Sequence, residues 1–166
     1  DEKYSISKFD VINETDGKND NYNAIIDVTY DYDNVEYHRQ YELFYKKYKE
    51  WVFADSSDYN EDTWEVKPTT APSASDYTEN CKSQLLKTIK YDKFEPVDSK
   101  TTVDLEAKTA TFVYSVESKT DIRKISGEIN FYYEFNDEKG EWVYKKFSYA
   151  DSYNKKYDLM KTWTGS

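Results

Sequence analysis

The feature that most constrains the fold of this chain is an internal repeat. Glu50-Trp51-Val52 follows one segment rich in aromatic residues, and Glu141-Trp142-Val143 follows another. Further upstream, Lys8-Phe9-Asp10 has a counterpart in Lys93-Phe94-Glu95. Because a sequence that resembles itself at a long period encodes one structural unit more than once, the chain is predicted to contain two related units.

Alternation of apolar and polar residues predicts antiparallel strands in the first half. Apolar side chains occupy every second position over 24–32 and again over most of 35–45, with a short Asp33-Asn34 connection between them. A period of two is typical of half-buried strands, and a short polar connection is typical of a hairpin. Ile6–Ile12 is expected to form an earlier strand, and Trp51 to open a later one.

The second half repeats this order and adds a helix. Strands are expected near 94–98 (or on to 105), 112–116, 125–135 and 142–149, with a turn at 136–140. Before them, apolar residues recur every four positions at Tyr77, Cys81, Leu85 and Ile89, which predicts a helix over roughly Ser75–Ile89. Cys81 on this stripe is expected to be a buried small hydrophobe.

A Pro-rich segment separates the halves. It predicts a first unit over 1–67, a linker over 68–74 and a second unit over 75–166. The first unit lacks a helical pattern, so its helix is expected before Asp1 or shortened into Asp1–Ser7. Alternatively, this unit has no helix, or both halves share one sheet. The predicted fold class is α+β, with two related units of curved antiparallel sheet, the second preceded by a helix.

The composition indicates that aromatic rings build the core. Leu, Ile, Val and Phe make up only 31 of 166 residues and the net charge is -10, close to the composition of disordered chains, roughly 20% of those four residues. Eighteen Tyr and four Trp offset this shortage, because each aromatic side chain buries about 150–250 Å². Trp51 and Trp142 are expected to anchor the two cores.

Charge and motifs exclude several classes of function. Residues 1–72 carry 17 acids and 8 bases, and residues 73–166 carry 16 and 15, so no basic patch favours nucleic-acid binding. Four Gly cannot form a dinucleotide or P-loop motif, and no cofactor is expected. The acidic runs lack the spacing of a calcium loop, so no metal site is expected. The single His38 is predicted to be a solvent-exposed surface residue, and no catalytic residue is assigned.

The candidate binding residues are aromatic and acidic. Trp64 and Trp163 lie late in their units among polar residues, where exposed rings would suit stacking on sugars or contacts with a protein. The remaining candidates are Tyr59 and the hairpin carboxylates Asp31 and Asp33.

The element order resembles the cystatin-like and nuclear-transport-factor-2-like α+β domains. The residues behind the resemblance are Lys93-Phe94-Glu95, 112–116, 131–135 and Glu141-Trp142-Val143, and it covers 73–166 better than 4–66. Such domains often occur on bacterial lipoproteins and membrane-anchored surface proteins, and their enzymatic members carry Asp and His in a pocket. Since His38 has no counterpart in the second half, no catalytic residue is carried over.

The sequence therefore predicts a non-enzymatic extracytoplasmic module that binds a protein or glycan partner at the cell surface or serves as a spacer. The chain begins at Asp1 without Met, so membrane attachment is expected only through an upstream anchor, as in a bacterial lipoprotein. The alternatives are a carbohydrate- or small-ligand-binding protein that uses Tyr and Trp, and, with less support, a small pocket enzyme. No run of about 20 apolar residues, the length that spans a bilayer, occurs.

Overall fold

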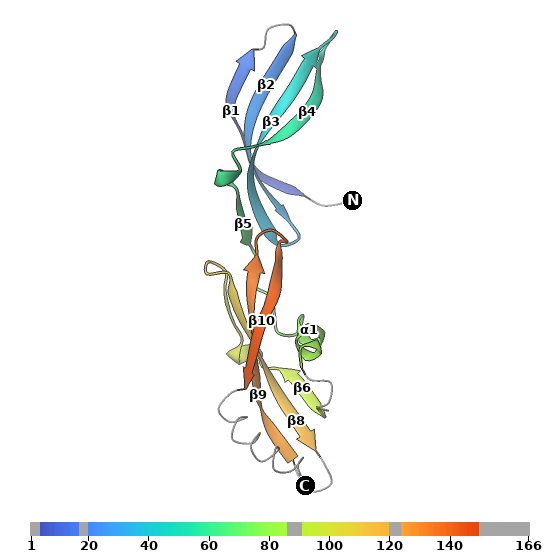
Figure 1. Cartoon of the computed structure of the whole chain (residues 1–166), viewed down its shortest axis with the longest axis vertical. Helices are drawn as coiled ribbons and strands as arrows, with labels where there is room; N and C mark the ends of the chain where they lie inside the picture. The colour runs from blue at the N-terminus through green and yellow to red at the C-terminus, as the bar shows by residue number, and fades with distance from the viewer. Residues whose placement is uncertain (1–3, 17–19, 86–90, 120–123, 150–166) are drawn as a thin grey trace. The chain divides into compact units, whose positions relative to one another are not determined.

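The computed structural model describes residues 4–16, 20–85, 91–119 and 124–149 of the chain (Figure 1). The chain divides into two compact units, Asp1–Thr70 with Asp137–Gly140, and Ala71–Asn136 with Glu141–Ser166. Each unit contains one antiparallel sheet, and each is described by itself.

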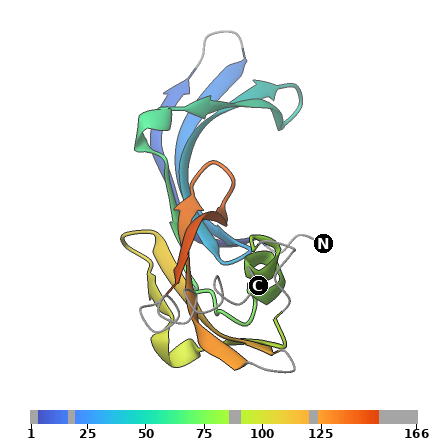
Figure 2. The same cartoon turned by 60° about the horizontal axis from the view of Figure 1, so that its bottom comes forward.

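The first unit is a meander of four long strands with a short fifth strand beside it. β1 (Ser5–Asp16), β2 (Asn21–Tyr32), β3 (Val35–Lys47) and β4 (Trp51–Tyr59) lie side by side in chain order. A short 3-10 helix, η1 (Glu61–Thr63), leads to β5 (Glu65–Pro68), which also pairs with β3. The sheet is curved rather than flat (Figure 2).

The hairpin between β2 and β3 follows from its two turn residues. Asp33 and Asn34 both have positive φ, 48° and 64°. Two successive residues in this region match the twist of the flanking strands, and Asn and Asp tolerate it better than other side chains do. The pairing of Tyr32 with Val35 closes this turn, as the sequence predicts.

Register divides the first sheet into two unlike faces. The side chains of β2 at even positions share one face with those of β3 at odd positions, as in the pairs Ile26–Tyr41 and Tyr30–Tyr37. We call this the aromatic face; its members are Tyr4, Ile6, Phe9, Val11, Glu14, Tyr22, Ala24, Ile26, Val28, Tyr30, Tyr32, Val35, Tyr37, Arg39, Tyr41, Leu43, Tyr45, Lys47, Trp51, Phe53, Ser56, Asp58, Val66 and Pro68. The opposite, polar face carries Asp27, His38 and Gln40.

The second unit is a similar meander with a helix added. Its elements are α1 (Thr78–Ser83), β6 (Lys93–Pro96), η2 (Asp98–Lys100), β7 (Thr102–Asp104), β8 (Thr109–Lys119), β9 (Lys124–Asn136) and β10 (Glu141–Tyr149). Strand order is β10-β9-β8-β6, and β7 also pairs with β8. The predicted first strand is therefore two short strands, separated by η2.

The core of the second unit lies between its sheet and the segment around α1. The sheet contributes rings and branched side chains, and the helical segment contributes Ala74, Cys81 and Leu85. The sheet members of this cluster are Ala110, Phe112, Tyr114, Val116, Ile129, Phe131 and Tyr133. The inward side chains predicted from alternation on β8 and β9 are thus confirmed at Phe112, Tyr114, Val116, Ile129, Phe131, Tyr133 and Phe135. The side chain of Ile125, also predicted to face inward, lies outside the described part. Gly140 has φ +65° in the turn before β10, within the turn predicted at 136–140.

The predicted α+β class is wrong, because the described residues are mostly β. Strands take up 66% and helical turns 9%. The helix spans six residues instead of the predicted 75–89, whose last part lies outside the described residues. The hydroxyls of Thr78 and Ser83 bond back to the carbonyls of Ala74 and Asn80, and such local bonds compete with the regular helix.

Two expectations for the first unit are also wrong. Ser5–Ser7 belongs to β1, so a helix shortened into this segment is wrong, although residues 1–3 lie outside the described part. The alternative of one shared sheet is also wrong, since the two halves form separate sheets.

Candidate binding surface

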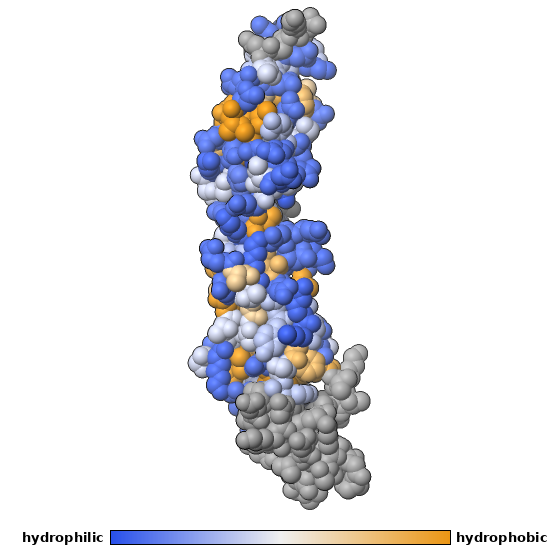
Figure 3. Space-filling view, turned by 60° about the vertical axis from the view of Figure 1, so that its left-hand side comes forward, coloured by the Kyte–Doolittle hydropathy of each residue, from blue (hydrophilic) through white to orange (hydrophobic). Residues whose placement is uncertain are grey.

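The aromatic face of the first sheet carries large apolar side chains that extend into solvent. Five of them lie on its two edge strands and are each about half exposed: Ile6 62%, Phe9 54%, Val11 48%, Trp51 46% and Phe53 54%. In Figure 3, hydrophobic residues of this unit lie open at the surface among hydrophilic ones. No helix covers this face among the described residues of the unit.

Two backbone hydrogen bonds show that this face corresponds to the helix-covered face of the second sheet. In the first unit, Lys47 N–H donates to Asp20 O at 2.8 Å; in the second, Phe135 N–H donates to Lys108 O at 3.0 Å. Lys47 is the last residue and Phe135 the last but one of the third strand in each meander, and both acceptors directly precede the second strand. For an L-residue in a strand, the side on which N–H points fixes the face of the side chain. The two faces are therefore equivalent.

The equivalence aligns the repeat residue by residue. Asp20 and Lys108 both have positive φ, 58° and 55°. Trp51 pairs with Lys47, and Trp142 pairs with Phe135. Each Trp begins the last long strand of its meander, as the repeat predicts.

Only one of these two Trp residues anchors a core. Trp142 packs against the buried cluster of the second unit, with its ring 5.5 Å from that of Phe135. Trp51 lies half exposed, 5.8 Å from the ring of Tyr22 and with Lys47 Nζ 5.6 Å from its own ring centre. The expectation that Trp51 anchors a core is wrong, because no helical segment of the described residues closes over its face.

Tyr rings order the end of the aromatic face that carries the β2–β3 hairpin. Tyr4 stacks on Tyr32 with ring centres 4.7 Å apart, and Tyr30 stacks on Tyr37 at 5.3 Å. Burial among these rings raises the pKa of Tyr30 to about 12. The hydroxyl of Tyr30 is therefore neutral at physiological pH.

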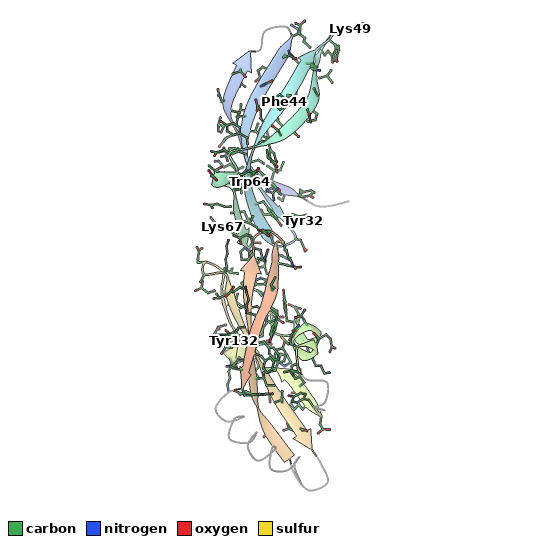
Figure 4. The ribbon with its side chains drawn as sticks, viewed as in Figure 1. Tyr32, Phe44, Lys49, Trp64, Lys67 and Tyr132 are labelled. Atoms are coloured by element: carbon green, nitrogen blue, oxygen red, sulfur yellow. The ribbon has the colours of Figure 1, made fainter. Side chains whose placement is uncertain are left out.

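Trp64, a predicted binding residue, is held by neighbours on this face (Figure 4). The Arg39 guanidinium lies 4.7 Å from its ring centre, and the Tyr41 ring lies 6.2 Å away. Its indole Nε1–H donates to Tyr59 O at 3.3 Å. One face of the Trp64 ring is therefore covered by a cation, and the ring is a fixed part of the surface.

The structure does not bring the other predicted binding residues together. Tyr59 ends β4 opposite Gln40, and its side chain is 38% exposed. Asp31 lies on the polar face opposite Glu36, and Asp33 lies in the hairpin turn. Trp163 lies outside the described residues.

A hydrogen-bonded cluster occupies the polar face behind this surface. Asp27 is buried and accepts from His38 Nε2 at 2.9 Å and from Gln40 Nε2 at 2.9 Å. His38 Nδ1 lies 3.0 Å from Thr63 O, and Lys8 Nζ lies 3.6 Å from Asp27 Oδ1. His38 is thus bonded and half-buried, where the sequence predicts a free surface residue. The Gln40 bond is the main cause that holds the pKa of Asp27 below its usual range, with His38 adding to it against the effect of burial.

Two kinds of feature are absent from the described residues. In that part of the chain, no three His, Cys, Asp or Glu side chains converge as a set that could hold a metal ion. None of its helices has the length and apolar character needed to cross a membrane.

Comparison with known proteins gives no family for this chain. No family model matches it, and no curated protein or solved structure matches it either.

Sequence reasoning missed the edge residues of the aromatic face. Phe9 and Val11 were assigned to a strand, and Phe53 to the strand after Trp51, with no expectation of exposure. The signal was available, because a period-two apolar face in 24–45 needs a cover and the first half offers no helical stripe.

Proposed function

We propose that this chain is a non-enzymatic binding module and that the aromatic face of the first unit is its binding surface. The observation that carries the proposal is the set of half-exposed apolar side chains from Ile6 to Phe53 on one face. Exposed apolar side chains that gather on one face, here along both of its edges, mark interaction sites in soluble proteins. The rings of this face also suit it to binding, since aromatic residues supply large contact area at low cost in conformational entropy.

The polar face supports a structural role for the one buried carboxylate–histidine pair. Both carboxylate oxygens of Asp27 and both ring nitrogens of His38 are engaged in contacts within the protein. A general base needs an available position next to a substrate. In this cluster the polar atoms are used to hold β2, β3 and the segment after η1 together.

A protein partner is the ligand class that the surface supports best. Its exposed residues are Ile, Val and Phe as well as Trp, and branched aliphatic side chains pack against other apolar side chains. Carbohydrate binding is the second candidate, and the half-exposed ring of Trp51 favours it. A glycan array distinguishes the two, because only the second candidate predicts a signal that Trp51→Ala removes.

The proposal places the module outside the cytoplasm, on a bacterial surface or envelope. Its support is the resemblance to domains of surface proteins; the single thiol, Cys81, fits a surface protein without disulfides and a reducing cytosol alike. Fractionation of cells that express the full-length gene product checks this: recovery with the cytosol contradicts it.

Photo-cross-linking tests the surface itself. A photoreactive phenylalanine analogue is placed at Phe53 on the aromatic face, or at Val52, which is 49% exposed and pairs with Lys46 on the polar face. Each labelled protein is incubated with a bacterial envelope preparation and irradiated. The protein labelled at position 53 is expected to give discrete adducts, and Phe9→Ser is expected to suppress them. The protein labelled at position 52 is expected to give no such adducts. Equal adducts from both positions, or none from either, contradict the proposal.

A further inference from the structure

We infer that the aromatic face of the first unit receives an amphipathic α-helix of a partner protein, with large apolar side chains on one side and basic side chains along one flank. This inference rests on the proposed function and names the class of partner for the same surface. Three observations carry it: a helix on the equivalent face of the second unit, half-exposed apolar side chains along both edges of the first face, and the charge of one edge.

The second unit shows what an equivalent face binds. There the segment around α1 lies on the sheet, with the ring of Tyr77 stacked on Phe112 at 4.8 Å. Cys81 Sγ lies 3.4 Å from the hydroxyl of Tyr133, and the Tyr114 hydroxyl donates to Ala74 O. A meander of this order and register therefore accepts a helical segment across its second and third strands.

The exposed apolar side chains of the first face lie along its two edges. Ala24, Ile26 and Val28 in the centre are only 6–7% exposed, whereas Phe9 on β1 and Phe53 on β4 are each 54% exposed. A helix that lies between the two edges must therefore bury apolar side chains on both sides of it. Large side chains such as Leu or Phe reach these edges and remove their apolar surface from water.

The charge of the β4 edge predicts the sign of the partner's flank. From Trp51 to Thr63 there are four carboxylates and no Lys or Arg. Asp58 lies on the aromatic face opposite Tyr41, while Glu61 and Asp62 are exposed in η1. Basic side chains on the helix flank along β4 would meet this edge, and the attraction would speed association.

The same charge disfavours a second copy of this chain as the occupant. Residues 1–72 carry 17 acids and 8 bases. Two such faces brought together would place their acidic edges close to each other, and like charges in contact oppose association. A basic helix is attracted by the negative charge of the first unit, whereas a second copy of the chain is repelled by it.

Binding of designed helices by the full chain tests the inference. The probe is a peptide of about 18 residues with Leu at helical i, i+4 spacing and Lys on the polar face. Its controls are a scrambled peptide of the same composition, a version with Glu for Lys, and a version with Ala for Leu. Calorimetric titration is expected to detect the Leu–Lys peptide alone, with a gain of helical circular dichroism and an affinity that falls as salt rises.

Matched variants locate the binding. Phe53→Ser and Phe9→Ser are expected to weaken the Leu–Lys peptide about tenfold or more, as for buried interface anchors. Val52→Ser, a change of similar exposure on the polar face, is expected to leave the affinity unchanged. Each variant is first checked for an unchanged denaturation midpoint, and Trp51→Ala serves in place of any that fails to fold.

Three results would overturn the inference. Equal binding of the scrambled peptide would show charge attraction without a helix site. Reversible dimerisation that Phe53→Ser abolishes, without peptide binding, would identify a second copy as the occupant. Failure of the peptide to bind while position 53 still cross-links to an envelope component would reject the helix and leave the proposed function standing.

Discussion

Asp27 organises the polar face of the first sheet. Its two oxygens receive bonds from His38 and Gln40 on the neighbouring strand. The other ring nitrogen of His38 lies 3.0 Å from Thr63 O. The cluster thereby joins β2 and β3 to the end of η1.

Replacement of Asp27 by Asn is expected to destabilise the first unit by about 1–3 kcal/mol, since one buried donor is left facing another. Because the pKa of Asp27 is lowered on folding, its contribution is present above the unfolded value of about 4 and is lost as pH falls through the folded value. Urea denaturation at pH 7 and near pH 2.5 measures both effects. The wild type should lose more stability on acidification than Asp27→Asn; equal losses would contradict this reading.

Cys81 is expected to be unreactive in the native state. Its side chain is fully buried, and burial raises the pKa of the thiol, so the reactive thiolate is scarce. A disulfide reagent such as Ellman's should label it only at the rate of unfolding. Fast labelling under native conditions would show that the segment around α1 opens readily.

At the scale of elements, the helical segment matters through its contacts rather than its length. Six residues form no stable helix alone, and Tyr77 and Cys81 supply the packing on the sheet. Tyr77→Ala is expected to destabilise the second unit by about 3 kcal/mol, as for other buried rings. The exposed Tyr48→Ala is the matched control, and a similar loss in both would contradict the packing assigned to α1.

The two repeat Trp residues should differ in energetic weight despite their equivalent positions. Trp142→Ala is expected to cost about 3 kcal/mol because its ring packs against a core, and Trp51→Ala about 1 kcal/mol or less because half of its surface stays in water. Equilibrium urea denaturation of the two single variants measures this difference. Equal costs would show that the aromatic face is covered in solution.

The strands could be predicted from the sequence, and the cover over each sheet could not. Alternation at 24–32 and 35–45 identified β2 and β3, and the Tyr77–Leu85 stripe identified the helical segment. Its length was overestimated, because hydroxyls at Thr78 and Ser83 bond to nearby carbonyls instead. The contacts of His38 and Trp64 depend on residues 11 to 25 positions away or on a turn, which no local pattern encodes.

At the scale of the whole molecule, the two repeats form sheets with the same strand order, but only one of the two sheets is covered by a helical segment. The second sheet is closed by its own helical segment, whereas the equivalent face of the first has no such cover among the described residues and is open along its edges. The unit with this open face also holds most of the net negative charge. Under the proposed function, binding is a property of the first unit.

Hydroxyl-radical footprinting with mass spectrometry tests this asymmetry most directly, because it reports the solvent access of individual rings. The account predicts rapid oxidation of Phe9 and Phe53 on the first face, and protection of Phe112 and Phe131 on the equivalent face of the second. Comparable protection of all four rings in the purified chain would contradict the open binding face.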